Sequence, residues 1–264
     1  MYKLIISDLD GTLVNNKKEI THYTKRVIEE VQKKGVEFII ATGRGYRGAK
    51  RVADVLKLEN EIICNNGSTI YDSNGELIFQ RIIDKNIVKK IFMRVLETSS
   101  IFFASYGNDI YISKGKIDAS RPFLLIPPDN ATELSPENIE NFDFEKIVIL
   151  DRDNNLLNTY LRELKDETNI KSFISQENFL DIVHFESSKG IALKYLANLK
   201  NIELKHILAF GDAFNDYEML KFAGKGVVLA NGFDELKEEF ESFDLTNDEN
   251  GVAEYISKVF HIEI

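Results

Sequence analysis

The segment LIISDLDGTLV, residues 4–14, places an apolar strand directly before two carboxylates, Asp8 and Asp10, and a Gly-Thr turn. Two acids spaced by one residue at the end of a buried strand are unfavourable, because like charges raise each other's pKa and resist desolvation. A cation between them would offset that cost, and a carboxylate held there can act as a nucleophile or an acid. Alone, the pair is also compatible with an ordinary turn, since Asp-Gly is a common turn dipeptide.

The chain around this segment alternates strands and helices. Thr21 is a candidate N-cap for a helix that ends at Gly35, and the apolar run at 36–42 is typical of a parallel strand covered on both faces. A helix near 46–57 and the strand IICN follow. The pattern returns after about residue 187, so the sequence predicts an α/β fold with a doubly wound parallel sheet.

The middle of the chain has a different pattern. Strand-like segments with hairpin-type connections alternate there with two amphipathic helices, expected at 86–97 and 154–165, and residues 127–138 are the most loop-like part. This is α+β character, and we interpret it as a separate module inserted between two halves of one sheet. The expected division is a core of residues 1–83 and 186–264 and an inserted α+β module of residues 84–185.

Composition and charge narrow the function classes. The chain has 264 residues, of which 44% are hydrophobic and 29% charged, and no apolar run is long enough for a membrane span. The N-terminal residues form a strand pattern rather than a signal peptide. A net charge of −10 without a basic block argues against a nucleic-acid partner. The single cysteine, Cys64, excludes an internal disulfide, favours a core thiol, and is typical of a reducing compartment, so we expect a cytoplasmic protein.

Groups capable of chemistry follow several predicted strands or open a predicted helix. In open parallel sheets, ligands bind at the carboxyl ends of the strands. The candidates are Asp8, Asp10, Thr42, Gly43, Arg44, Lys189, Asp212, Asn215 and Asp216. Together they supply carboxylates, a hydroxyl, a lysine and an amide, a set that suits phosphoryl transfer.

The expected chemistry begins with a divalent cation held by Asp8 and Asp212, which shields both the nucleophile and the phosphate. Asp8 would then attack phosphorus. Asp10 would protonate the leaving alcohol and later deprotonate water, which asks for a raised pKa that we attribute to the adjacent anion. Thr42 would hydrogen-bond a phosphoryl oxygen, and Lys189 would neutralise developing charge.

Each candidate also has a purely structural interpretation. Lys189 starts a helix that Ser187 or Ser188 can cap, and a cation there opposes the helix dipole by roughly a few tenths of a kcal/mol, which favours a functional role. Asp216 at a helix start can serve the dipole alone, whereas Asp212 precedes the helix and is the better candidate ligand. Arg44 is either a solvated side chain or a substrate contact.

The four histidines show no metal-ligand spacing, so we interpret them as structural or surface residues and leave open a substrate role for His184. The aromatic residues between positions 92 and 111 are assigned to packing of the inserted module rather than to a base-stacking platform.

The segments DLDGTL, TGR, SKG and GDAFND occur in the order of the four motifs of the haloacid dehalogenase (HAD) superfamily of phosphatases, which the chain resembles over essentially its whole length. The inserted module and the NNG at 65–67 are similar to the Cof-type subfamily with a type IIB cap. The resemblance implies a Mg²⁺-dependent phosphatase for small phosphorylated metabolites, with 84–185 as the cap. It implies sugar phosphates first, with flavin mononucleotide or pyridoxal phosphate as further options.

The resemblance also implies a role for each motif residue. Asp8 is the nucleophile and Asp10 the acid/base, and the phosphate ligands are Thr42, Gly43, Lys189 and Asn215. The metal ligands are Asp8, the backbone carbonyl of Asp10, Asp212 and Asp216, with Asn215 and Asp216 supporting or joining the metal shell. Two rival functions remain: a receiver-like switch that holds an aspartyl-phosphate without turnover, and a phosphomutase of the same superfamily. The oligomeric state is open.

Overall fold

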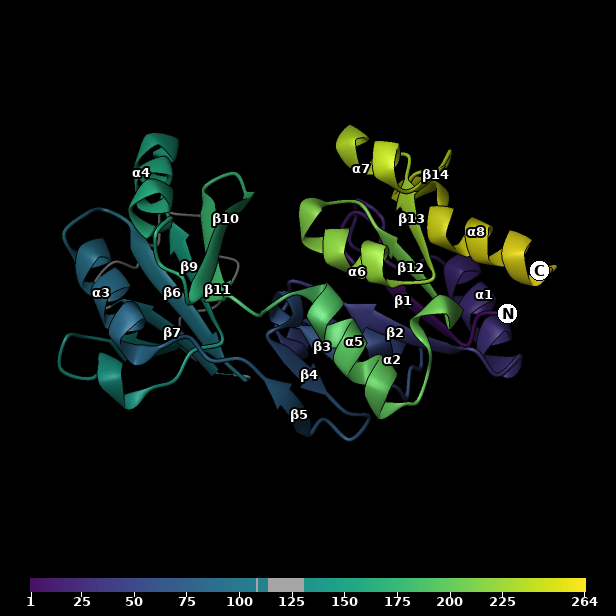
Figure 1. The fold of residues 1–264 in the computed structure, drawn as a ribbon, viewed down its shortest axis with the longest axis horizontal. Coiled ribbons are helices and arrows are strands. Elements are labelled where there is room, and N and C mark those ends of the chain that lie inside the picture. The colour runs from purple at the N-terminus through teal and green to yellow at the C-terminus, as the bar shows by residue number, and fades with distance from the viewer. Residues whose placement is uncertain (108, 114–130) are drawn as a thin grey trace. The chain divides into compact units, whose positions relative to one another are not determined.

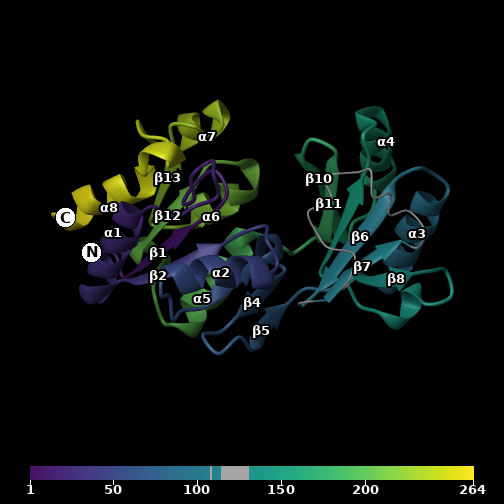
Figure 2. The same ribbon diagram turned by 180° about the vertical axis from the view of Figure 1, so that it is seen from behind.

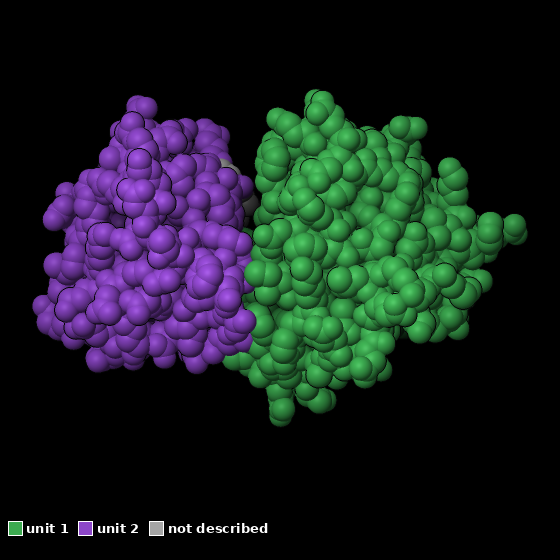
Figure 3. All heavy atoms as spheres, viewed as in Figure 1, with its two compact units in different colours: residues 1–79, 188–264 green, residues 80–187 purple. Residues whose placement is uncertain are grey.

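The computed structural model describes residues 1–107, 109–113 and 131–264. The chain divides into two compact units, coloured separately in Figure 3: unit 1 comprises Met1–Phe79 and Ser188–Ile264, and unit 2 comprises Gln80–Ser187. Each unit has its own sheet and its own hydrophobic clusters. Among the described residues, no helix combines the length and the apolar character that crossing a membrane requires.

Unit 1 is built on an eight-stranded sheet with the order β14-β13-β12-β1-β2-β3-β4-β5 (Figure 1). The strands are β1 (Leu4–Ser7), β2 (Glu37–Ala41), β3 (Ile62–Cys64), β4 (Thr69–Tyr71), β5 (Leu77–Gln80), β12 (Ile207–Gly211), β13 (Lys225–Leu229) and β14 (Glu241–Phe243). Every pair from β14 to β3 is parallel, and β3 pairs with β4 in antiparallel orientation. The predicted doubly wound parallel sheet is therefore confirmed, with an antiparallel extension at one edge.

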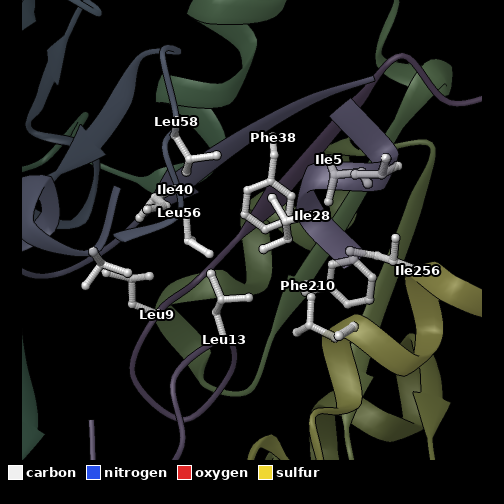
Figure 4. Close-up of a cluster of buried hydrophobic side chains, with 14 of the residues drawn as sticks. Ile5, Leu9, Leu13, Ile28, Phe38, Ile40, Leu56, Leu58, Phe210 and Ile256 are labelled. Carbon is white, nitrogen blue, oxygen red and sulfur yellow. The ribbon is translucent and has the colours of Figure 1, made fainter. Parts of the chain in front are cut away.

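Helices cover both faces of this sheet. They are α1 (His22–Lys33), α2 (Tyr46–Val55), α5 (Lys189–Leu199), α6 (Tyr217–Phe222), α7 (Asp234–Glu239) and α8 (Gly251–Phe260), with short 3-10 helices η1 (Asn65–Gly67), η4 (Leu204–His206), η5 (Phe214–Asp216) and η6 (Asn247–Glu249). Side chains of α1, α2 and α8 pack on one face, and side chains of α5, α6 and α7 pack on the other. Figure 4 shows part of the first cluster, in which Phe38 and Phe210 of the sheet lie near Ile28 and Ile256 of the helices.

The sequence signals at the ends of α1 are confirmed. The Thr21 hydroxyl accepts a hydrogen bond from the Thr24 N–H at 3.1 Å, so it caps the helix as predicted. Gly35 follows the helix with a φ of +80°, a conformation that glycine adopts without a steric penalty. These two residues set the length of the first crossover and thereby the start of β2.

Unit 2 contains a six-stranded sheet with the order β10-β11-β9-β6-β7-β8 (Figure 2). Its elements are α3 (Lys85–Leu96), β6 (Ile101–Tyr106), β7 (Asp109–Ser113), β8 (Ala131–Leu134), η3 (Ile139–Asn141), β9 (Lys146–Leu150), α4 (Asn154–Leu164), β10 (Ile170–Gln176) and β11 (Phe179–His184). The pairs are antiparallel except for β7 with β8, which run parallel. The α+β character predicted for this part is confirmed.

Side-chain packing in unit 2 agrees with the amphipathic patterns. Helices α3 and α4 bury their apolar faces against one face of the sheet, in a cluster that includes Phe92, Phe102 and Tyr111. Those aromatic residues therefore serve packing, as expected. The expectation of a loop over 127–138 is wrong for Ala131–Leu134, which pairs with β7 as strand β8 and buries Leu134 in the same cluster. Residues 127–130 lie outside the described part of the chain.

Candidate active site

The site lies within unit 1, at the adjacent strands β1 and β12. From β1 the chain crosses over to β2 on one side, and from β12 it crosses over to β13 on the other. Strands β1 and β12 are parallel neighbours, and the Asp8 N–H donates to the Phe210 carbonyl at 3.0 Å. Asp8 follows β1 and Asp212 follows β12, so both acids emerge at the carboxyl edge of the sheet. Carboxylate oxygens of Asp8, Asp212 and Asp216 lie within 4.8 Å of one another. Acids separated by two hundred residues in sequence thus form one cluster.

Lys189 is fully buried at the centre of this cluster. Its Nζ donates to Asp8 Oδ1 at 2.5 Å and to Asp216 Oδ1 at 2.6 Å. Burial opposes its charge, but the two aspartates more than compensate and raise the pKa of Lys189 above its ordinary value. The Ser188 hydroxyl accepts from the Ile191 N–H at 2.9 Å, so Ser188 rather than Ser187 caps α5. The helix start thus aims a lysine at the acids, despite the dipole.

Asp216 has two functions in this geometry. Its Oδ2 accepts from the backbone N–H groups of Asp212 and Ala213, at 3.0 and 3.1 Å, while its Oδ1 binds Lys189. The structural interpretation of Asp216 as an acidic helix start is therefore compatible with a place in the site. Because it accepts a hydrogen bond from the backbone N–H of Asp212, Asp216 also helps to position the Asp212 carboxylate.

The cluster has more negative than positive charge. Burial raises the pKa of Asp8 to about 8, with Asp216 and Asp212 adding to the effect and Lys189 opposing it. Burial and Asp216 likewise raise the pKa of Asp212 to about 6, against a hydrogen bond from Thr12 and the charge of Lys189. One lysine cannot balance three carboxylates in a buried setting. A second cation would remove the imbalance.

The donor set fits a magnesium ion. Mg²⁺ prefers carboxylate and carbonyl oxygens at about 2.0–2.1 Å, so two ligands of one ion lie up to about 4 Å apart. Oxygens grouped within 4.8 Å meet that requirement after small adjustments. The Thr12 hydroxyl donates to Asp212 Oδ1 at 2.6 Å and leaves Oδ2 facing Gly11, where a Cβ would collide with the carboxylate. Asp8, Asp212 and Asp216 are therefore the residues that could hold the ion.

Asp10 occupies a different electrostatic environment from Asp8. Its carboxylate accepts two hydrogen bonds from the Arg44 guanidinium, both at 2.7 Å, and a third from Lys18 Nζ at 2.8 Å. Although burial acts in the opposite direction, these bonds lower the pKa of Asp10 to about 2. The expected raised pKa of Asp10 is therefore wrong, because the hydrogen bonds and charges of Arg44 and Lys18 outweigh the effect of burial. Lys18 gave no recognisable signal in the sequence.

Thr42 is buried at the carboxyl end of β2. Its N–H donates to the Ile63 carbonyl at 2.9 Å, and its hydroxyl accepts from the Arg44 N–H at 3.1 Å. The hydroxyl thus keeps its own hydrogen for donation to an anionic oxygen. This geometry agrees with a phosphate contact and explains how Thr42 and Arg44 share one turn.

Asn215 and Gly43 meet at a residue that the sequence did not single out. The Asn215 side-chain N–H donates to Asn66 Oδ1 at 3.0 Å, and a Cβ on Gly43 would lie 3.0 Å from the same oxygen. Asn66 appeared in the sequence only as part of the NNG segment. An Asn-Gly pair directly after a predicted strand end, where Asn tolerates a positive φ, is the signal that would have found it.

The remaining sequence expectations concern single residues. Cys64, the single cysteine of the chain, is a buried thiol, as predicted for a core cysteine. His206 Nδ1 contacts the Met1 carbonyl at 3.0 Å, in agreement with a structural role. His184 is the acceptor for the Glu186 N–H at 3.1 Å, and burial lowers its pKa.

Comparison with known proteins decides the family. The sequence pattern of the haloacid dehalogenase-like hydrolases matches residues 5–256. The chain belongs to this family. BU028/BU029 of Buchnera aphidicola subsp. Acyrthosiphon pisum, which carries a phosphatase name, is 34% identical over 272 residues, covering 98% of this chain and 97% of that protein. The family resemblance predicted from the four motifs is confirmed, and this HAD-like chain is a phosphatase.

Two further relatives support the same conclusion. YwtE of Bacillus subtilis, named a 5-amino-6-(5-phospho-D-ribitylamino)uracil phosphatase, is 31% identical over 282 residues, covering 97% of this HAD-like chain and 98% of that protein. The crystal structure of a haloacid dehalogenase-like hydrolase from Bacteroides thetaiotaomicron matches with a TM-score of 0.86 at 26% identity, covering 98% of this chain and 100% of that one.

Proposed function

We propose that this phosphatase hydrolyses small phosphate monoesters with Mg²⁺, through an aspartyl-phosphate formed on Asp8. The observation that carries the proposal is the buried group of Asp8, Asp212 and Asp216 around Lys189. Its excess negative charge favours a bound dication, and its place at the carboxyl ends of β1 and β12 is where ligands of such sheets bind.

The residues then have distinct tasks. A bound Mg²⁺ would supply charge neutralisation for Asp8 and for the phosphoryl oxygens. Asp8 attacks phosphorus, the bond from phosphorus to the ester oxygen breaks, and Asp10 delivers a proton to the leaving alcohol. Asp10 next takes a proton from water, whose oxygen attacks phosphorus, and the bond to Asp8 breaks with release of phosphate. Thr42 and Lys189 stabilise the oxygens that carry the transferred charge.

Asp10 needs a change of partners for this role. With Arg44 and Lys18 bound, its pKa is about 2, and a protonated Asp10 is rare at neutral pH. An anionic substrate competes for the same two cations. We infer that substrate binding draws Arg44 and Lys18 from Asp10, raises its pKa and so prepares the acid. This assigns Arg44 a substrate contact and explains why the acid is held ionised until substrate arrives.

Substrate choice follows from parts outside this cluster. In our proposal unit 1 is the catalytic core and unit 2 is the cap that determines substrate specificity. Sugar phosphates and related metabolites are the proposed class, and the named substrate of YwtE, a phosphorylated ribitylamino compound, belongs to the same polyol-phosphate chemistry. We place the enzyme in the cytoplasm, where such metabolites occur.

The rival functions have less support. A receiver-like switch keeps its aspartyl-phosphate, whereas Asp10 beside Asp8 would supply the acid/base for fast dephosphorylation, and the relatives carry phosphatase names. A phosphomutase would transfer the phosphoryl group to a second sugar hydroxyl rather than to water. Product analysis separates these three outcomes.

The direct test is phosphate release from a panel of phosphorylated metabolites with and without Mg²⁺. We expect Asp8→Asn to reduce kcat by at least about 10³-fold, as removal of a nucleophile does in other enzymes. Asp234→Asn, an exposed aspartate of the same unit, is the matched control and should retain wild-type kcat. A folded Asp8→Asn protein with undiminished activity would refute the assignment of the nucleophile.

A further inference from the structure

Three consecutive residues in the turn after β3 have positive φ angles. They are Asn65 at 50°, Asn66 at 55° and Gly67 at 89°. Left-handed backbone is unfavourable for residues with a Cβ, and Asn tolerates it better than most. Strained backbone of this kind persists where the surroundings over-determine it, and such places cluster at functional sites. Asn65 and Asn66 are both buried in the turn.

The contacts of Asn66 reach two motif segments. Its backbone N–H donates to the Thr42 carbonyl at 3.0 Å, and its side-chain Oδ1 accepts from the Asn215 Nδ2 at 3.0 Å. One residue therefore fixes both the turn that carries the Thr42 hydroxyl and the amide of the loop after β12. Both segments belong to unit 1. They are far apart in sequence, and the strands that they follow, β2 and β12, are not neighbours in the sheet.

Two glycines let the segments approach the turn closely. A Cβ at Gly43 would lie 3.0 Å from the Asn66 side-chain oxygen, and a Cβ at Gly67 would collide with the carbonyl of Ser188, the cap of α5. The turn therefore also abuts the helix start that carries Lys189. Three of the four motif segments pack around Asn66 and its neighbour.

We propose that Asn66 is a positioning residue of the phosphate site, which orients the Asn215 amide and the Thr42 turn toward one bound phosphoryl group. The inference rests on the proposed phosphatase function and assigns a role to a residue outside the four motifs. The side-chain Oδ1 of Asn66 accepts from Asn215 Nδ2, so it determines which end of the Asn215 amide faces away from the turn. The left-handed conformation is what allows the backbone and side chain of Asn66 to face two different segments.

The test uses Asn66→Gly, Asn215→Ala and the double variant. Glycine keeps the left-handed backbone without strain, so the fold is preserved while the side-chain acceptor is lost. We expect Asn66→Gly to lower kcat/KM by about 10–100-fold, the range found for residues that orient the groups of a site. Asn66→Asp retains an acceptor and should keep more activity than Asn66→Gly. Asn201→Gly, an exposed Asn with a φ of 52°, is the control and should keep wild-type kcat/KM.

Coupling distinguishes positioning from a general structural role. If Asn66 acts through Asn215, the activity of the double variant should equal that of the less active single variant. The inhibition constant of inorganic phosphate with Mg²⁺ should also rise, by roughly tenfold, in Asn66→Gly. Additive losses, or an Asn66→Gly protein with wild-type kcat/KM and phosphate inhibition, would overturn the inference. Absence of Mg²⁺-dependent phosphate release from the wild type would instead refute the proposed function, and phosphate binding followed by thermal shift would still test Asn66.

Discussion

Asp8 and Asp10 are two residues apart, yet the fold places them in opposite electrostatic environments. Asp8 lies in a buried group of three acids with one lysine, and its pKa is raised to about 8. Asp10 is partly exposed, accepts hydrogen bonds from two cations, and its pKa is lowered to about 2. A nucleophile should be ionised and an acid protonated, so each carboxyl group has the pKa that suits the other role.

The difference shows what is needed to complete the site. Mg²⁺ bound among the acids would lower the pKa of Asp8, and release of Arg44 and Lys18 would raise that of Asp10. Bound metal would therefore adjust the pKa of Asp8, and bound substrate would independently adjust that of Asp10. A substitution that changes the charge around Asp8 or around Asp10 should leave the other environment intact.

Replacing the central lysine should have the largest effect. Lys189→Ala leaves Asp8 and Asp216 without their buried cation, and removing one partner of a buried ion pair costs about 3–5 kcal/mol. We expect this loss at pH 8 in urea unfolding without metal, and a smaller one at pH 5 because the acids then bind protons. Phosphate release should fall by at least about 10³-fold, since charge stabilisation at the phosphoryl group is also lost.

Lys200→Ala is the matched control for that experiment. Lys200 also bridges two acids, Glu37 and Glu61, at 2.7 Å each, but Glu37 begins β2 and Glu61 precedes β3, at the opposite edge of the sheet. It should reduce stability without reducing kcat. Equal losses of activity in the two variants would show that Lys189 has only a structural role.

Removing one cation from Asp10 should have an intermediate effect. Lys18 is largely exposed and helps to hold Asp10 ionised, so Lys18→Ala should raise the pKa of Asp10. A larger fraction of the protein then carries the protonated acid at a given pH. The alkaline limb of the kcat/KM profile should therefore move to higher pH. At a given pH on that limb, kcat/KM for esters with poor leaving groups should rise several-fold.

The neighbouring Lys17 provides the comparison, because it is exposed and the structure shows no bond from it to Asp10. Lys17→Ala should keep the wild-type pH profile. If both lysine variants behave alike, net charge rather than the bond to Asp10 is responsible.

Without metal, the stability of the folded protein should itself depend on pH. Because the pKa values of Asp8 and Asp212 are raised to about 8 and about 6, the folded state binds protons that the unfolded state has released. The free energy of unfolding should therefore fall as pH rises from about 4 to about 8. Asp10 contributes oppositely, and its stabilisation is lost only as pH falls toward 2.

Thermal unfolding in EDTA and in Mg²⁺ at pH 5 and pH 8 measures this dependence. For a domain of this size, each 1 kcal/mol corresponds to about 2–4 °C in Tm. We expect Mg²⁺ to flatten the curve and Asp8→Asn to remove part of it. A metal-free protein that gains stability between pH 5 and pH 8 would contradict the buried-acid account.

Much of the fold was predictable because it rests on local patterns. The strand that leads into Asp8, the Thr21 cap and the turn at Gly35 specify a strand-helix-strand unit by nearby interactions alone. The α+β pattern of the inserted part follows equally from local periodicity. The loop expected over 127–138 was wrong at Ala131–Leu134, because pairing with β7 depends on residues that are distant in sequence.

For the site, the sequence by itself determined which kinds of groups lie at the carboxyl ends of the strands, since strand ends and the order of strands and helices can be read from the chain. Only the tertiary structure decided how charges are paired. It bound Asp10 to Arg44 and Lys18, placed Lys189 between Asp8 and Asp216, and brought Asn66 to Asn215. A pKa depends on burial and on charges within a few ångströms. Those neighbours come from distant segments, so no local pattern in the sequence specifies them.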